Sequence, residues 1–347
     1  MSRRRPPKIS GLLPVTKANG PTSHDVVDKA RRALKERRIG HTGTLDPMAE
    51  GLLLLCVGHA TRLQQYLLGW PKTYHGVVRL GFATTTYDRE GEASDPRGEA
   101  PALDRETLAG IEQRFDGTFD QVPPPYSAKK VDGKKLYELA RSGKSVEIEP
   151  KSVTVHSLAL RSEREAEIDL TVTTSTGFYV RSLAHDIGRM LGCGGYLHHL
   201  CRQAIGPYKV EDALPQQALD DARDFAEILE SKAWIPLDQI MLPLPELTIN
   251  AAAADRFVHG QEVVVFKTGT ESIETDGQVV IRASNGSLVG IGVVKAVLAR
   301  GRTINVHPTM VLAEDNNFGG RRLVRGPKNC QRRNFLLTYL SLLAPGG

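Results

Sequence analysis

The chain has 347 residues, of which 40% are hydrophobic, and its 45 Lys and Arg against 40 Asp and Glu leave a formal net charge of +5. This length accommodates one large domain and a smaller one. The composition excludes a disulfide-stapled secreted scaffold, because only four cysteines are scattered along the chain, and no apolar stretch approaches the roughly 20 residues that a membrane-spanning helix requires.

The positive charge is unevenly placed. Basic residues cluster at 3–5, 31–38 and 321–333, and such clusters suit a polyanion such as RNA or DNA. Solvated helix faces and a basic tail would explain them equally well. The arginine-rich N-terminus lacks the apolar segment of a secretory signal, so we expect a cytoplasmic protein.

The N-terminal part combines short strands and helices. Residues 11–15 predict a strand, Gly20-Pro21 a turn, and Thr22 with Asp25 a capping box that begins a helix. The apolar run 52–57 is bounded by glycines and predicts a buried strand. Further on, the pattern predicts the following: a helix carrying Leu63, Tyr66 and Leu67, a strand at 74–80, a surface loop at 88–101 and a helix at 103–115.

The middle of the chain continues this mixture. We expect a strand at 153–160, and apolar residues alternate with polar ones through 167–172, which indicates a half-buried strand. A turn at 175–177 precedes a helix at 182–191, in which Leu183, Ile187, Met190 and Leu191 are the expected buried residues. Strands and helices do not alternate regularly, and this favours an α+β fold over a doubly wound sheet.

The composition shifts at the Leu-Pro-Leu-Pro stretch of residues 242–245, which predicts a linker. Short strands separated by turns follow it, at 262–266, 279–283, 288–294 and 303–306, and they predict a small β-barrel. We therefore expect a large N-terminal domain at 9–240, a β-rich domain at 246–315 and a basic C-terminal extension at 316–347.

The segment HTGTLDPMAEG, residues 41–51, places one acid in an unusual setting. Pro47 favours an extended backbone at Asp46, while Gly43 and Gly51 permit tight turns around it. The acid is thus presented on a loop beside a buried strand, which suits a positioned catalytic group. A turn aspartate that bonds its own backbone would show the same local features.

Other motifs fail on spacing. Gly143-Lys144-Ser145 resembles the end of a phosphate-binding loop, but Glu138 stands where the first glycine should be. The cluster of Cys193, His198, His199 and Cys201 matches no standard zinc spacing, so we expect no metal.

Three further stretches can accompany Asp46 at a site. Tyr74 begins a strand, Tyr179 and Arg181 follow a turn in GFYVR, and LCRQAIG, residues 200–206, predicts a second loop. Tyrosines stack on unstacked bases, and an arginine beside a carboxylate keeps it ionised. Each of these residues, taken alone, also fits an ordinary core or surface position.

In succession, these stretches resemble the TruB family of tRNA pseudouridine synthases. The resemblance covers roughly residues 10–210: GLLPVTKANGPTSHDVV, IGHTGTLDPMAEGLLLLCVGHATRL, KTYHGVVRLG, PPPYSAKKVDGKKLYELAR, GFYVRSLAHDIG and LCRQAIGPY. Beyond residue 245 the chain is similar to a PUA domain, an RNA-binding fold, with Gly290-Ile291-Gly292 and Val306-His307-Pro308 in comparable places. The resemblance implies a largely antiparallel mixed sheet flanked by helices.

The resemblance also implies the chemistry. It predicts isomerisation of uridine to pseudouridine at position 55 in the T loop of tRNA, by a monomer that needs no cofactor and no protein partner. Asp46 becomes the catalytic aspartate, ionised at neutral pH. Addition to the ribose, addition to the base and abstraction of a sugar proton are all open to it.

Roles for other residues follow from the matching motifs. Tyr74 would stack on the flipped uracil, Tyr179 would line the pocket, and Leu200 would form its apolar wall. Arg181 would pair with Asp46, and His41 would meet the T loop and keep the target base extruded, since an enzyme acting on a base must take it out of the stack.

This chain departs from the family at two places. Cys201-Arg202 stands where two arginines are common, and the extension beyond residue 313 is long and carries Arg321, Arg322, Arg325, Lys328, Arg332 and Arg333. The extension is a candidate RNA contact. Two alternatives remain: a non-catalytic protein that binds or folds RNA, and an RNA-guided synthase of a ribonucleoprotein.

Overall fold

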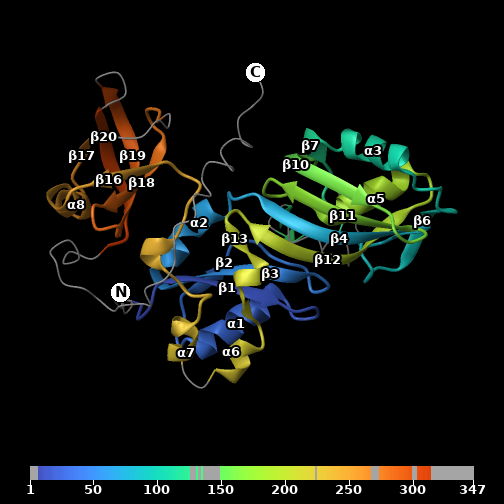
Figure 1. The fold of residues 1–347 in the computed structure, drawn as a ribbon, viewed down its shortest axis with the longest axis horizontal. Helices are drawn as coiled ribbons and strands as arrows, with labels where there is room; N and C mark the ends of the chain where they lie inside the picture. Colours follow the sequence, from blue (N-terminus) through green and yellow to red (C-terminus); the bar gives the residue numbers. More distant parts are fainter. Residues whose placement is uncertain are drawn as a thin grey trace.

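The computed structural model describes residues 7–125, 130–131, 134–135, 149–222, 225–266, 273–298 and 303–313. Two sheets dominate it, one in each half of Figure 1, and helices flank both. The extension expected at 316–347 lies outside the described residues. No helix in the described ranges is long and apolar enough to cross a membrane.

The large sheet has 11 strands, ordered β14-β1-β3-β12-β4-β11-β10-β7 along its main path. β13 pairs with β12, β15 with β1 and β2 with β3. Only β1–β14 and β12–β3 are parallel, so the sheet is mixed and largely antiparallel, as expected. Its strands are β1 (Gly11–Lys17), β2 (Ile39–His41), β3 (Glu50–Val57), β4 (Lys72–Leu80), β7 (Gly117–Gln121), β10 (Lys151–Arg161), β11 (Glu167–Thr174), β12 (Gly195–Ile205), β13 (Tyr208–Lys209), β14 (Leu214–Pro215) and β15 (Ile235–Pro236).

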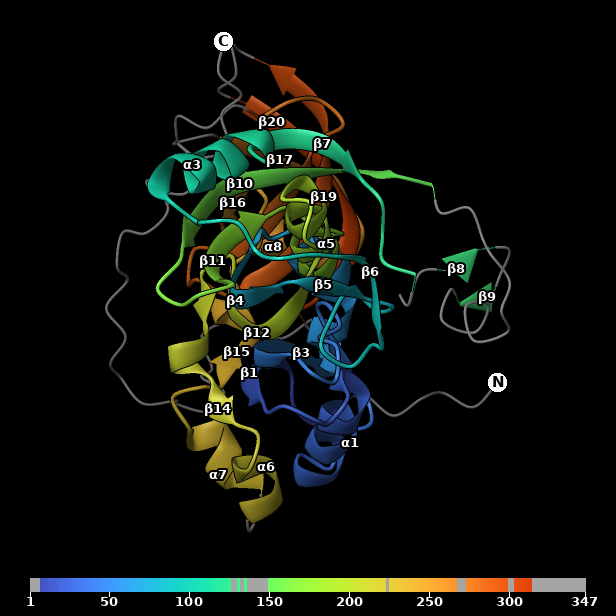
Figure 2. The ribbon, with the colours of Figure 1, turned by 90° about the vertical axis from the view of Figure 1, so that its right-hand side faces the viewer.

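Helices cover the sheet in two groups (Figures 1 and 2). The first group packs on β1 and β3 through a shared apolar cluster; it comprises α1 (Ser23–Ala33), α6 (Ala218–Asp221) and α7 (Phe225–Glu230). The second packs on β4, β10 and β11; it comprises α3 (Arg105–Arg114) and α5 (Val180–Met190). The capping box of α1 is present, since Thr22 accepts from the Asp25 backbone and Asp25 from that of Thr22.

Short elements complete the large domain. They are η1 (Gly58–Leu63), α2 (Gln64–Leu67), η2 (Val210–Asp212) and η3 (Leu237–Gln239), with two separate hairpins formed by β5 (Phe82–Thr84) with β6 (Ala93–Arg97) and by β8 (Lys130–Val131) with β9 (Lys134–Lys135).

Three local expectations were wrong. The surface loop at 88–101 contains β6, which pairs with β5. The segment 200–206 is not a second loop, because its backbone pairs with β4 as part of β12. Met190, expected in the core, is 52% exposed. It is the last residue of α5.

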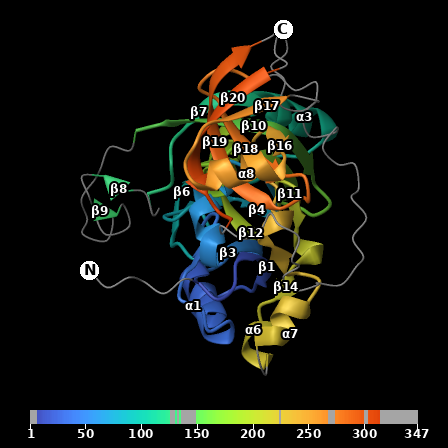
Figure 3. The same cartoon turned by 90° about the vertical axis from the view of Figure 1, so that its left-hand side faces the viewer.

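The C-terminal domain is a curled five-stranded sheet, ordered β16-β18-β19-β20-β17, with one helix against it (Figure 3). Its elements are β16 (Glu246–Ile249), α8 (Ala251–Val258), β17 (Val263–Phe266), β18 (Gln278–Ala283), β19 (Leu288–Leu298) and β20 (Thr303–Val311). The sheet is a half-barrel consistent with a PUA-like domain. The expected domain boundaries remain a prediction.

The two sheets share a buried apolar cluster. Leu52, Leu54 and Leu67 of the large domain belong to the same cluster as Val280 and Ile291 of the C-terminal sheet. The linker takes part, with Ile240 fully buried and Leu242 6% exposed. Burial of apolar surface therefore fixes the smaller domain against the larger one.

Candidate functional site

The site is built on the loop of residues 42–49, between β2 and β3. Gly43 has a φ of 135° and Gly51 a φ of 99°, a region that favours glycine. Leu45, Met48 and Ala49 are buried in the core. The loop therefore anchors its apolar side chains beneath itself and leaves Asp46, whose side chain is 39% exposed, at the surface.

Almost every carbonyl of this loop has a donor. Ser23 donates through its hydroxyl to Leu45 (3.0 Å), and Gly20 donates to Pro47 (2.9 Å). The ammonium of Lys17 donates to Pro47 (3.1 Å) and Ala49 (2.6 Å). A loop with so many partners is a rigid support, because each broken bond would leave a buried polar group unpaired.

Arg181 meets Asp46 directly. Its Nε lies 2.9 Å from Oδ2 of Asp46, and its Nη1 lies 3.3 Å from Oδ2 of Asp88 and donates to the carbonyl of Thr86 at 3.1 Å. The side chains of Arg181 and Asp88 are only 7% and 5% exposed. One guanidinium between two carboxylates leaves a net negative charge on the trio, and Asp46 is the end that faces solvent.

Asp88 is the site residue that the sequence did not reveal. It ends the polar stretch TTTYD, and its Oδ1 accepts from the Thr86 hydroxyl (2.6 Å) and the Glu90 backbone (3.0 Å). The only local signal was an acid in a glycine-containing turn. Its role depends on Arg181, which lies 93 positions away in the sequence.

The other expected residues surround the loop. Tyr74 on β4 is 9% exposed and Leu200 on β12 is 6% exposed, and both belong to the cluster that contains Leu45 and Met48. Gly76 lies opposite Leu200 in the sheet. A Cβ on Gly76 would lie 3.0 Å from the His199 carbonyl and 3.5 Å from Leu200 Cδ1, so glycine allows β12 to approach closely.

Tyr179 occupies the N-cap position of α5 and is half-buried. Gln121 holds its backbone from both sides, accepting from its N–H (2.8 Å) and donating to its carbonyl (3.1 Å). Gln121 is itself 3% exposed. The position of the Tyr179 backbone is thus fixed against the edge strand β7.

His41 lies at the end of β2 and is half-buried. Its Nδ1 accepts from the Gly43 N–H (3.3 Å), and its carbonyl accepts from Gln64 (2.8 Å). Burial, together with the nearby charge of Arg202, lowers the pKa of His41 below its usual value. The ring is therefore neutral at physiological pH and suits stacking or hydrogen bonding rather than an ion pair with phosphate.

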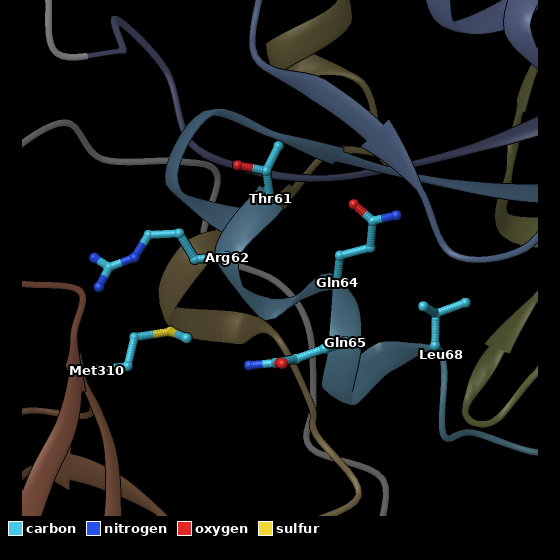
Figure 4. Close-up of a pocket in the computed structure, with 6 residues that line it drawn as sticks. All are labelled: Thr61, Arg62, Gln64, Gln65, Leu68 and Met310. Atoms are coloured by element: carbon cyan, nitrogen blue, oxygen red, sulfur yellow. The ribbon is translucent and has the colours of Figure 1, made fainter. Parts of the chain in front are cut away.

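A hollow of about 490 Å³ lies away from Asp46, between α2 and the C-terminal sheet (Figure 4). It is lined by Thr61, Arg62, Gln64, Gln65, Leu68 and Met310. Arg62 reaches across to donate to the carbonyl of Val311. This open hollow marks the junction of the domains, and none of the expected site residues lines it.

Comparisons with known proteins identify relatives of this architecture. The family model for the N-terminal domain of TruB family pseudouridylate synthases matches residues 31–180, and two C-terminal family models, for tRNA pseudouridylate synthase B and for pseudouridine synthase II TruB, match 181–248 and 245–299. A tRNA pseudouridine synthase B of Burkholderia mallei (strain NCTC 10247) is 40% identical over 84% of this chain and 94% of its own length. The Aquifex aeolicus (strain VF5) tRNA pseudouridine synthase B is 38% identical over 83% and 96%.

Among solved structures, an H/ACA RNP bound to a substrate RNA containing 2′-deoxyuridine has a chain that superposes with a TM-score of 0.67. The identity is 23%, over 88% of this chain and 86% of that one. This similarity supports the fold assignment.

Proposed function

This chain belongs to the TruB family of pseudouridylate synthases, and on that premise we propose that its target is uridine 55 in the T loop of tRNA and that Asp46 is its catalytic carboxylate. It is a tRNA pseudouridine synthase: it isomerises uridine to pseudouridine in tRNA. The observation that carries the assignment of Asp46 is the ion pair with Arg181, which holds a half-exposed carboxylate on a buried support.

The reaction breaks the bond between C1′ and N1 and forms a bond between C1′ and C5. A proton leaves C5 and N1 gains one, so substrate and product are isomers. Asp46 is an anion held at a fixed place by Arg181, and the second carboxylate, Asp88, prevents the guanidinium from neutralising it completely. Such an anion serves the three roles that we consider: attack on the ribose, attack on the base, and removal of a sugar proton.

The surrounding residues would receive the flipped base. Tyr74 stacks on the uracil, Leu200 forms the apolar wall, and Tyr179 lines the other side and helps relay a proton. His41, neutral and at the end of β2, contacts the T loop and keeps the base extruded. Stacking of this kind offsets the few kcal/mol that extrusion of a base costs.

Replacement of Asp46 by Asn tests the assignment, since the amide is nearly isosteric but uncharged. We expect loss of pseudouridine formation, with tRNA binding retained because Asp46 contributes no positive charge. The matched control is Asp28→Asn, which neutralises a carboxylate on α1 whose side chain is 47% exposed. Turnover by the Asp46→Asn protein at the rate of the control would remove Asp46 from the mechanism.

We further propose that the protein acts alone, as a monomer in the cytoplasm, without guide RNA, protein partner or cofactor. The support is the high coverage of the relatives named tRNA pseudouridine synthase B. Purified protein should convert the uridine of a bare T-arm hairpin. A requirement for a guide RNA would favour an RNA-guided enzyme, and binding without conversion would favour a non-catalytic RNA-binding role.

A further inference from the structure

Arg202 is the largest fully buried side chain among the described residues, with 1% of its surface exposed. It lies on β12, directly opposite Tyr74 of β4 and beside Gly51 of β3. Its Nε donates to the carbonyl of Leu52 at 2.7 Å, and its Nη2 donates to the carbonyl of Gly43 at 3.0 Å. These two carbonyls stand on either side of the loop that carries Asp46.

A third contact extends this arrangement to Tyr74. The Tyr74 hydroxyl lies near the Arg202 guanidinium and partly offsets the lowering of its pKa by burial. Arg202 therefore bonds the loop that presents the catalytic carboxylate and lies next to the residue assigned to stack on the base.

Burial of the charged Arg202 side chain at this position costs free energy. Burial lowers the pKa of the guanidinium from its usual value, and within the described part of the chain no carboxylate forms a salt bridge with it. A buried cation is tolerated only when its donors find acceptors. The planar fork of arginine supplies several donors in a fixed geometry, which lysine does not.

We infer that Arg202 is a positioning residue for the reaction: it sets the distance between the Asp46 loop and the Tyr74 ring so that both meet the same nucleotide. This inference rests on the proposed roles of Asp46 and Tyr74. Arg202 is buried, so its effect passes through the loop and the tyrosine. A misplacement of about 1 Å in such a site costs about 100-fold in rate.

The test compares Arg202→Lys and Arg202→Met under single-turnover conditions with a T-arm hairpin. We expect the rate constant of pseudouridine formation to fall about 100-fold in the Met variant. We expect the Lys variant to recover part of this loss, because it can still donate to one carbonyl. The dissociation constant for the hairpin should stay within about threefold of wild type, which separates positioning from binding.

Leu160→Ala is the control for general destabilisation, because Leu160 is a buried residue of β10 in the same core cluster. It should lower the melting temperature without slowing the reaction at temperatures well below melting. A folded Arg202→Lys or Arg202→Met protein with a wild-type rate constant, or an equal slowing by Leu160→Ala, would overturn the inference.

A double-mutant cycle isolates the link to the tyrosine. Tyr74→Phe removes only the hydroxyl, so Arg202→Lys should slow a Tyr74→Phe enzyme less than it slows the wild type. Additive effects would contradict a coupling of ring and loop through Arg202. If Asp46→Asn is inactive while the Arg202 variants react normally, the inference alone fails; if Asp46→Asn is active, the proposed site itself fails.

Discussion

Arginines hold both the Asp46 loop, residues 42–49, and the domain junction, but in different ways. At the loop, Arg202 is fully buried and bonds the carbonyls of Gly43 and Leu52 without a salt bridge in the described structure. At the junction, the side chain of Arg282 is 12% exposed and pairs with the Glu246 carboxylate. It also donates to the carbonyls of Asp238 (2.6 Å) and Ile240 (2.7 Å).

The difference concerns precision. Arg282 has a charged partner and some contact with solvent, so its burial costs little free energy. Apolar burial provides most of the contact between the two domains there. The loop cations, Lys17 and Arg202, are fully buried at a cost in desolvation, and backbone carbonyls accept hydrogen bonds from them. Such an arrangement tolerates little displacement, which suits a catalytic carboxylate; the junction needs only to keep two domains together. Variants of the loop cations should therefore change the rate of the reaction, whereas variants at the junction should change proteolysis of the linker and tRNA affinity.

After the Arg202 variants, the largest effect in this comparison is expected for Lys17→Met. The change removes the donor for the carbonyls of Ala18, Pro47 and Ala49, and unpaired buried carbonyls cost about 1–3 kcal/mol. We expect a lower free energy of unfolding and a single-turnover rate reduced about tenfold or more, by displacement of the loop. Denaturant unfolding and rapid-quench measurements check these outcomes.

Lys72→Met is the matched control, because it removes a buried lysine that donates to the carbonyls of Leu68 and Trp70 instead. Equal slowing by both variants would contradict a specific role of Lys17.

The same lysine predicts a pH dependence. Burial lowers the pKa of Lys17 from 10.5 to about 8. Above about pH 8 the amine keeps two protons for three carbonyls, so the rate should fall with an apparent pKa near that value. The free energy of unfolding should instead rise with pH. The pKa of Lys17 is lower in the folded protein than in the unfolded chain, so between about pH 8 and pH 10.5 deprotonation favours the folded state. If the rate of the Lys17→Met protein still falls above about pH 8, another group causes this pH dependence.

An intermediate effect is expected from truncation after residue 313. The removed segment carries Arg321, Arg322, Arg325, Lys328, Arg332 and Arg333. Loss of phosphate contacts should weaken tRNA binding about tenfold at low salt and flatten the dependence of affinity on salt. The rate constant at saturating tRNA should be unchanged, because the loop is untouched. Unchanged affinity and salt slope would remove the extension from tRNA binding.

Several features of the site were predictable because they are local. The loop around Asp46 follows from its glycines and Pro47, and the buried strand after it from an apolar run between two glycines. Thr22 and Asp25 predicted the start of α1. The pairing of Arg181 with Asp46 came from the family resemblance, since no local pattern joins residues 135 positions apart.

The rest depends on sheet register. Residues 200–206 were expected to form a loop because a polar and small-residue segment resembles one, but pairing with β4 makes it a strand. That register alone places Arg202 beside Tyr74 and buries it. Asp88 was missed for the same reason, since its partner Arg181 comes from a distant helix. Met190 was misassigned because helical periodicity does not show which positions at the end of a helix other elements leave uncovered.

The smallest effect is expected for Arg282→Met, which tests the junction side of the comparison. Loss of the guanidinium leaves the linker held by Tyr208, whose hydroxyl donates to the carbonyl of Met241 and accepts from its N–H, both at 3.0 Å. The shared apolar cluster is also retained. We expect easier proteolysis near residues 241–245 and tRNA affinity reduced about threefold, in line with the modest net value of such pairs. The single-turnover rate at saturating tRNA should stay at the wild-type level, and a rate loss comparable to that of Lys17→Met would show that the junction also positions the Asp46 loop.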